Sequence, residues 1–282
     1  MPLFNGKIKV IIGKPNQDGI LVDDLYIRFS CQKNKSSVDA NSCSIDIYNL
    51  NEDRRNAINE KEDILILEAG YAEEYGAERI FIGDITSVTH RYDVNNIITT
   101  IDVKDGYNFI TKDKRAVSFA SASVKQMLNS ILEDVNLKSN LALINFSDFK
   151  FNYGYSYAGS TKMLLDNLTS FVGINWSVQN NEIFFDKNEF LDYQVAIILN
   201  KYTGMTGSPE RIKTKKTETN DDKNINGWQV SSLLLPHALP GGNVLLSSRI
   251  TGDNKRMKII NVQHTGDNID GNFQTDLEVR AL

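Results

Sequence analysis

The stretch that decides the expected fold lies near the C-terminal end and reads Gly227-Trp-Gln-Val-Ser-Ser-Leu-Leu-Leu-Pro-His-Ala-Leu-Pro-Gly-Gly-Asn-Val-Leu-Leu-Ser-Ser248. It follows Thr203-Gly-Met-Thr-Gly-Ser-Pro-Glu-Arg-Ile212 and precedes Arg256-Met-Lys-Ile-Ile-Asn-Val-Gln-His-Thr-Gly-Asp267. Apolar runs separated by Pro and Gly turns predict a strand, a short turn and two further strands. No cluster of reactive side chains interrupts these runs, which favours a structural role over catalysis.

The first hundred residues show the two-residue period of half-buried strands. Leu25, Ile27, Phe29 and Cys31 alternate with polar or amphipathic neighbours. The same pattern predicts strands over residues 7–12, 43–47, 63–71, 79–89 and 97–104. One short helix over 50–58, capped by Asn51, interrupts them. Six short strands with a single small helix indicate a compact barrel or sandwich.

The middle of the chain changes to a mixed pattern. Residues 121–135 form an amphipathic helix with Ser121 or Ser123 as its cap, and a second helix over 160–172 ends at Gly173. Residues 174–185 then predict a hairpin around an Asn-rich turn.

The expected fold class is therefore mainly β with an α+β insert. Strand patterns return over residues 228–235, 243–248, 257–264 and 273–280. We expect two small β-barrel domains of the tube type, at 1–105 and 197–282, flanking a small α+β domain at 106–196.

Composition narrows the classes of function. The 282 residues carry a net charge of −5, which argues mildly against a dedicated nucleic-acid binder but does not exclude a protein that lines a passage for DNA without gripping it. We see no signal peptide, and the longest apolar runs, such as 195–199, are too short to span a membrane. The only cysteines, Cys31 and Cys43, lack a CxxC spacing, and we expect buried free thiols rather than a bridge.

Nine short pieces of the sequence, in a consistent order along the chain, resemble the Mu-like family of phage baseplate hub proteins of contractile tails. Near the C-terminal end these are a "TG-x-x-G-x-P" start, a "V-x-SLL-P-x-L-x-PG" middle and a "V-x-H-x-GD" end. At the front, Ile45-Asp-Ile-Tyr-Asn-Leu50, Ala69-Gly-Tyr71, Ile80-Phe-Ile-Gly-Asp-Ile85 and Asp105-Gly106 are similar to the first hub barrel. In the middle, Ala158-Gly-Ser-Thr161 and Gly173-Ile-Asn-Trp-Ser-Val178 resemble the insert.

The resemblance implies a part of the virion tail that is assembled in the host cytoplasm. Hubs of this family are homotrimers in which each subunit supplies two related barrels, so that six barrels form a ring. That ring matches the hexameric tail tube or a tube-terminating protein on one side, and the threefold side receives a trimeric spike. The channel carries the tape-measure protein and later DNA in transit. Other baseplate proteins are further partners, and no cofactor or membrane anchor is implied.

The chemistry-bearing residues do not assemble into a reactive motif. His90, His237 and His264 lie far apart in sequence, so no metal site is expected, and we expect His264 to make a local hydrogen bond near the Gly266-Asp267 turn. Adjacent acids such as Asp23-Asp24 and Glu133-Asp134 point apart in regular structure. Neither a phosphate loop nor a GxSxG elbow occurs. Trp176 and Trp228, which could stack on sugars or bases, fit core packing better.

Two alternatives from other classes stay open. A carbohydrate-active depolymerase or lytic module would need two carboxylates converging across a cleft. A small-molecule-binding barrel would bind a ligand saturably and form no higher-order assembly.

Three segments are the expected assembly interfaces. The first is the charged loop 213–226, in which Lys213, Lys215, Lys216, Asp221 and Asp222 stand out; the second is the turn Pro240, Gly241 and Gly242; the third is the loop with Glu73 and Glu74. Exposed loops and strand edges are where such a fold bonds to neighbours. A solvated surface without a partner is the alternative for the first and the third.

Overall fold

A computed structural model describes residues 6–15, 17–35, 40–58, 63–71, 76–108, 114–135, 137–187, 196–212, 227–269 and 273–281. The first unit comprises β1 (Gly6–Gly13), β2 (Ile20–Val22), β3 (Ile27–Asn34), β4 (Ser42–Tyr48), α1 (Glu52–Ala57), β5 (Ile64–Tyr71), β6 (Glu78–Asp93) and β7 (Asn96–Lys104).

The insert comprises β8 (Lys114–Phe119), β9 (Ala122–Ser123), α2 (Val124–Val135), a 3-10 turn (Leu141–Leu143), β10 (Lys150–Phe151), β11 (Tyr155–Ser160), α3 (Thr161–Val172), β12 (Asn175–Gln179) and β13 (Glu182–Asp186). The second unit comprises β14 (Ala196–Leu199), β15 (Glu210–Arg211), β16 (Gly227–Leu233), β17 (Asn243–Ser248), β18 (Gly252–Asp267) and β19 (Gln274–Arg280). The predicted mainly β fold with an α+β insert is confirmed.

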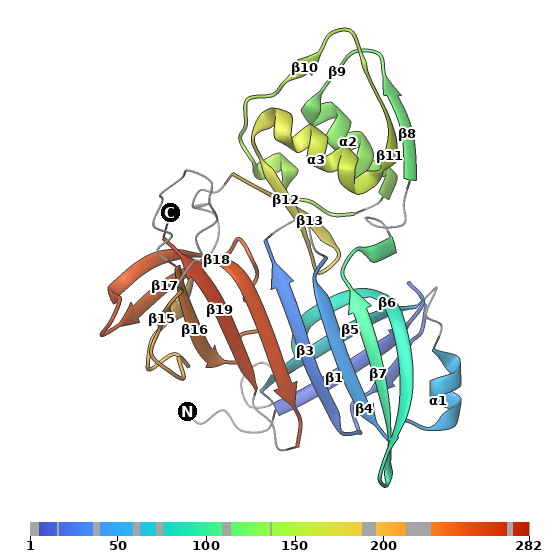
Figure 1. The fold of residues 1–282 in the computed structure, drawn as a ribbon, viewed down its shortest axis with the longest axis vertical. Coiled ribbons are helices and arrows are strands. Elements are labelled where there is room, and N and C mark those ends of the chain that lie inside the picture. Colours follow the sequence, from blue (N-terminus) through green and yellow to red (C-terminus); the bar gives the residue numbers. More distant parts are fainter. Residues whose placement is uncertain are drawn as a thin grey trace.

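One continuous sheet joins the two β units. Its strand order is β15-β16-β19-β18-β3-β4-β7-β6-β5-β1-β2, and β14 and β17 attach beside β18. The two units meet where β18 runs antiparallel to β3, from Asn261 opposite Asn34 to Asp267 opposite Arg28. Figure 1 shows these two strands side by side at the centre of the molecule, with the insert above them. No strand pairing in the described part of the chain closes either unit into a separate barrel.

Three clusters of buried apolar side chains follow the three parts of the chain. One lies among β1 to β7, one in the insert and one among β14 to β19. Leu234 of the second unit belongs to the first cluster, so the two sheet units also share apolar contacts. The limits at residues 105 and 196 remain a proposal for the domain division.

Local sequence signals account for the helix ends and the insert hairpin. Asn51 accepts a hydrogen bond from the backbone N–H of Arg54, and Ser160 caps α3 in the same way. Gly173 ends α3 with a φ of 65°. Asn180 and Asn181 both have positive φ and form the two-residue turn between β12 and β13, as a type I′ hairpin requires.

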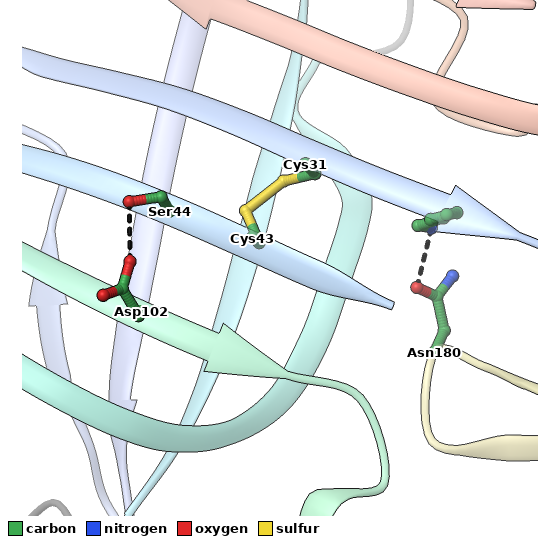
Figure 2. The surroundings of a disulfide bond; sticks show 6 residues. Cys31, Cys43, Ser44, Asp102 and Asn180 are labelled. Carbon is green, nitrogen blue, oxygen red and sulfur yellow. Dashed lines mark hydrogen bonds between the residues drawn. A yellow bond between two sulfur atoms is a disulfide. The ribbon is translucent and has the colours of Figure 1, made fainter. Parts of the chain in front are cut away.

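The prediction of free thiols at Cys31 and Cys43 is wrong. The two residues lie directly opposite each other on β3 and β4, with Cα atoms 4.0 Å apart, and they form a disulfide (Figure 2). The backbone N–H of Tyr48 donates to the carbonyl of Tyr26 in the same ladder, so alternation makes Cys31 and Cys43 a non-hydrogen-bonded pair, in which side chains approach most closely. Strand patterns do not specify register, and the bridge depends on register.

Buried polar groups hold the insert hairpin against the first sheet unit. The carboxylate of Asp105, after β7, accepts the backbone N–H groups of Asn180 and Asn181 at 2.6 and 2.8 Å. The side-chain amide of Asn41 donates to the carbonyl of Val178 at 2.7 Å, and Lys33 donates to Asn180 at 2.9 Å. Asp105, Asn41 and Lys33 are all buried.

A second set of contacts at this junction reaches the other unit. Asp186 at the end of β13 pairs with Lys35 beyond β3 and with Lys258 of β18. Burial acts to raise the pKa of Asp186, but the two lysines outweigh it and the pKa is lowered. One carboxylate therefore links the insert to both halves of the sheet.

Replacing Asp105 with alanine should destabilise the fold. D105A leaves two buried N–H groups without their acceptor and removes the negative charge near Lys33, so we expect a loss of about 3 kcal/mol in the free energy of unfolding. Urea denaturation monitored by tryptophan fluorescence measures it. D23A, at an exposed carboxylate, is the matched control. Equal stability of D105A and D23A would contradict the assigned role.

Candidate functional site

The most extensive shared feature of the two units is a polar face on the continuous sheet. Residues in register across neighbouring strands project on the same side. One such row contains Gln274, Thr265, Ser30, Ser44, Asp102 and Ser87. The next contains Ser231, Asp276, Gln263, Gln32 and Ser42. Because these rows cross from β19 to β3 without interruption, the face belongs to neither unit alone.

Side chains on this face bond to one another across the strands. Ser44 donates to Asp102 at 2.8 Å, as Figure 2 shows, and Thr100 donates to Asp46 at 2.6 Å. In the second unit, the Asn261 amide donates to Glu278 at 2.6 Å. Such cross-strand contacts stabilise a sheet and hold the polar groups in place.

Some charges on the face are paired with each other, and the carboxylates of Asp102 and Asp276 accept hydrogen bonds from serine hydroxyls. Arg28 pairs with Asp267 at 3.2 Å, and Arg280 pairs with Glu278 at 2.6 Å. A groove of about 410 Å³ lies where the two units join, lined by Gln32, Lys33, Asn34, Ile212, Gln229, Asn261, Val262, Gln263, Asp276, Leu277 and Glu278. A surface of amides, hydroxyls and paired charges contacts a polyanion without strong attraction, since attraction requires unpaired basic groups.

The second unit repeats the first. Strands β3 to β7 and β15 to β19 have the same neighbours in the same chain order, with β6 and β18 both 16 residues long. The β6–β7 ladder shifts register between Ile85 and Ser87, and the β18–β19 ladder shifts between Ile259 and Asn261. Lys104 and Arg280 lie opposite Asp84 and Lys258, one residue before these shifts, so the residues of the two ladders correspond one to one. The units differ where β1 pairs antiparallel with β5 but β14 pairs parallel with β17.

A matched pair of histidines supports this correspondence. His90 lies opposite Thr99 and His264 opposite Thr275, at the same distance beyond the two register shifts. The Nδ1 atoms lie 3.1 and 3.0 Å from the respective threonine hydroxyls. We expected His264 to bond near the Gly266-Asp267 turn, but its hydrogen bond is made to Thr275 on the neighbouring strand β19. This pairing of strands cannot be read from the order of residues along the chain.

His264 is fully buried, whereas His90 is exposed. Burial, with Lys33 nearby as a smaller cause, lowers the pKa of His264 to about 3, so the ring is neutral at neutral pH. Burial likewise lowers the pKa of Lys33 to about 8 and raises that of Asp105 to about 6. These groups are enclosed where the two units and the insert meet, and we assign them a structural role in holding the three parts together.

Most of the predicted interface residues lie outside the described residues. These are Lys213, Lys215, Lys216, Asp221, Asp222, Glu73 and Glu74. The turn of Pro240, Gly241 and Gly242 is described: Pro240 is buried, and Gly241 and Gly242 exchange backbone hydrogen bonds with Ile259 of β18. This turn also lines a cleft of about 540 Å³ together with Gln179 and Phe184 of the insert hairpin. Its role as an interface remains a proposal.

The tryptophans and the adjacent acids occupy structural positions. Trp176 is buried in the insert core and donates to Asp166 at 2.8 Å, and Trp228 packs against the second-unit core. Asp24 pairs with Arg54, and Asp134 pairs with Arg115. Within the described ranges, no three His, Cys, Asp or Glu residues are placed to hold a metal ion. No helix among those described is long and apolar enough to cross a membrane.

Comparison with known proteins gives a family and several structural relatives. A family described as "Baseplate hub gp41" matches residues 7–251. No curated protein matches the sequence. A tail protein from Neisseria meningitidis MC58 is similar in structure, with a TM-score of 0.64 and 10% identity over 99% of this chain and 97% of that one.

Two other solved structures are similar at comparable levels. The 43 kDa tail protein of prophage MuSo2 from Shewanella oneidensis has a TM-score of 0.61 and 10% identity over 96% of this chain and 98% of that one. An E. coli type VI secretion component, described as similar to the T4 tail proteins gp27 and gp5, has a TM-score of 0.62 and 11% identity over 90% and 73%. At these identities the likeness establishes the fold.

Substituting His264 should remove part of the acid sensitivity of this fold. A lowered folded-state pKa means that the unfolded chain binds the proton more tightly, so His264 costs no stability above pH 6.5 and destabilises progressively as the pH falls from 6.5 toward 3. About two pH units below 6.5, the loss is about 3 kcal/mol. H264Q should therefore show a shallower decline in unfolding free energy over this range, measured by urea denaturation. N129Q, at an exposed position of the insert, should keep the wild-type slope; equal slopes for H264Q and wild type would refute the assignment.

Proposed function

Because the chain belongs to the Baseplate hub gp41 family, which matches residues 7–251 of its 282, we propose that it is a structural baseplate hub subunit of a contractile tail. In this proposal it acts as a homotrimer that joins the hexameric tail tube, or a tube-terminating protein, to a trimeric spike. It resides in the tail baseplate of the virion and is assembled in the host cytoplasm.

The internal repeat is the observation that carries the proposal. Three copies of a chain with two matched β units present six similar units around one axis, which suits contact with a sixfold tube. The insert occurs once in each chain, so the same trimer has threefold features for a spike. This combination explains why one chain contains both a repeat and an unrepeated part.

The polar sheet face supports a channel-lining role. Its hydroxyls, amides and paired charges extend across both units, and residues such as Ser30, Gln32 and Gln263 carry no charge. The tape-measure protein, and later DNA, would pass such a surface without being held. The net charge of −5 is consistent with that use.

The relatives support spike and tail partners. One structural neighbour is part of a PdpA–VgrG complex from Francisella, with a TM-score of 0.63 and 10% identity over 99% of this chain and 58% of that one. The E. coli relative is described by its likeness to two tail proteins. We extend these associations to tube, spike and other baseplate partners for this chain.

We propose that the role is not enzymatic. The buried carboxylate of Asp105 accepts backbone N–H groups and that of Asp186 pairs with lysines, so these two groups do not face each other across a cleft. A glycan-cleaving function requires two converging carboxylates. Incubating the purified chain with murein or capsule and finding released sugars would overturn this part of the proposal.

Light scattering of the purified chain, with and without the spike protein, tests the oligomeric state. We expect a mass three times that of the 31.8 kDa chain, alone or on addition of spike. A monomer that is unaffected by the spike would contradict the hub role and favour a ligand-binding or carbohydrate-active domain.

Adding positive charge to the polar face should impede DNA passage. S30K/Q32K places two unpaired ammonium groups on β3, so we expect salt-dependent binding of duplex DNA in gel shifts and slower genome release from tails of normal appearance. The control is N129K/Y153K, which adds the same charge at exposed positions of the insert. Equal DNA binding by the two variants would exclude the face as the channel lining.

A further inference from the structure

A buried lysine lies beside a side-chain amide where the insert meets the sheet. Lys33, on the core side of β3, is 1% exposed, and its Nζ atom donates a hydrogen bond to Oδ1 of Asn180 at 2.9 Å. Asn180 belongs to the turn between β12 and β13, and Figure 2 shows its side chain directed at the end of β3. An amine and a carboxamide from two parts of the chain are therefore in direct contact.

The turn that carries Asn180 is held in place by its own backbone. The backbone N–H groups of Asn180 and Asn181 both donate to the Asp105 carboxylate, at 2.6 and 2.8 Å. Just before the turn, the carbonyl of Val178 accepts from the side-chain amide of Asn41 at 2.7 Å. With the backbone fixed in this way, the carboxamide of Asn180 stays beside Lys33. Fixed placement of two groups is what makes a reaction between them fast.

The surroundings of Lys33 favour its neutral amine form. The fully buried ring of Phe81 has its centroid 5.9 Å from Nζ. Burial lowers the pKa of Lys33 to about 8, against the opposing effect of the Asp105 charge. Burial also raises the pKa of Asp105 to about 6, although its hydrogen bonds act to lower it. A neutral lysine amine is a nucleophile, whereas the ammonium ion is not, so Lys33 is able to react near neutral pH.

We propose that Lys33 and Asn180 form a covalent amide bond, an isopeptide cross-link between β3 and the insert hairpin. One ammonium proton of Lys33 passes to the Asp105 carboxylate, and the Nζ amine then attacks Cγ of Asn180. The new N–C bond forms, the bond from Cγ to the amide nitrogen breaks, and a second proton passes from Nζ to the leaving nitrogen. The products are the cross-link and ammonia, which takes the proton back from Asp105. No atom changes its oxidation state.

The ion pairs at the same junction do not meet these conditions. Asp186 pairs with both Lys35 and Lys258, and the two lysines outweigh burial and lower the pKa of Asp186. Its carboxylate is therefore ionised, and an ionised carboxylate is a poor electrophile for an amine. The Asp186 contacts stay ionic and provide a comparison within the same molecule.

The cross-link ties the insert to the sheet at a place where apolar packing does not. Among the described residues, the apolar cluster of the insert contains no side chain from either sheet unit. Hydrogen bonds and ion pairs hold the junction instead. A covalent bond there closes a loop over residues 33–180 and keeps the insert in place under load. It forms within a single chain, so it does not depend on the proposed trimer.

Mass spectrometry of the full-length chain, reduced and denatured, tests the bond. We expect wild type to be lighter than the mass of its sequence by one ammonia. A protease digest should contain one branched peptide that joins Lys33 to Asn180, with Lys258 unlinked. On a reducing denaturing gel, wild type should migrate faster than K33R, because the loop over residues 33–180 is closed. Both mass readings need no variant.

Two substitutions remove one reactant each. K33R replaces the amine with a guanidinium, and N180G removes the carboxamide while suiting the positive φ of 55° at this position. Both should have the full mass of their sequences. N49G is the matched control, since Asn49 also has a positive φ, of 58°, and lies in another turn; it should keep the ammonia loss. An ammonia loss that K33R and N180G retain comes from another asparagine and overturns the proposal.

The pH dependence and D105N test the part played by Asp105. In chain freshly made by cell-free synthesis, we expect the cross-link to form about tenfold faster for each pH unit below the Lys33 pKa of about 8, because the amine fraction grows in that proportion. D105N, which cannot take up the proton, should fold by circular dichroism and keep its full mass. Folded wild type that still has the full mass of its sequence after prolonged incubation at a pH near this pKa overturns the cross-link.

Discussion

The antiparallel contact of β18 with β3 is the constraint on which the rest of the structure depends. Seven successive residues of each strand pair across it, from Asn261 to Asp267 and from Asn34 to Arg28. Backbone ladders leave little freedom in the angle between the strands that they join, because register and spacing are set by hydrogen bonds. The two repeated units are consequently held as one curved sheet, and their polar faces become one surface.

This contact also creates a site where polar groups must be buried. The C-terminal end of β3 and the middle of β18 meet the β12–β13 hairpin, and Lys33, Asp105 and Lys258 are enclosed there. Enclosed charges are tolerated only when paired and hydrogen-bonded, and here the partners come from all three parts of the chain. The insert is thereby oriented by specific bonds, which apolar packing alone would not provide.

The two faces of the sheet have different roles: one forms the cores, and the other forms the polar surface proposed to line the channel. One face buries alternate residues such as Ile45, Ile101 and Val262 in the cores, while the other presents hydroxyls, amides and paired charges. The period of two along each strand produces both faces at once, so the polar surface extends wherever the ladder continues. A surface built in this way can be long and uniform without any dedicated binding pocket.

The sequence by itself determined the local structure. Alternating residues such as Ile27 and Phe29 set the strands, Asn51, Ser160 and Gly173 set helix ends, and Asn180-Asn181 set the hairpin turn. These signals act over a few residues, so they can be read along the chain.

Only the tertiary structure decided how strands from opposite ends of the chain pair. The β3–β18 contact, the disulfide of Cys31 and Cys43, and the match of His90 with His264 all depend on register between strands. A strand pattern with period two is equally compatible with every register that differs by two residues, so it leaves these pairings undetermined. For that reason the candidate surface and its paired charges emerge only when the sheet is assembled.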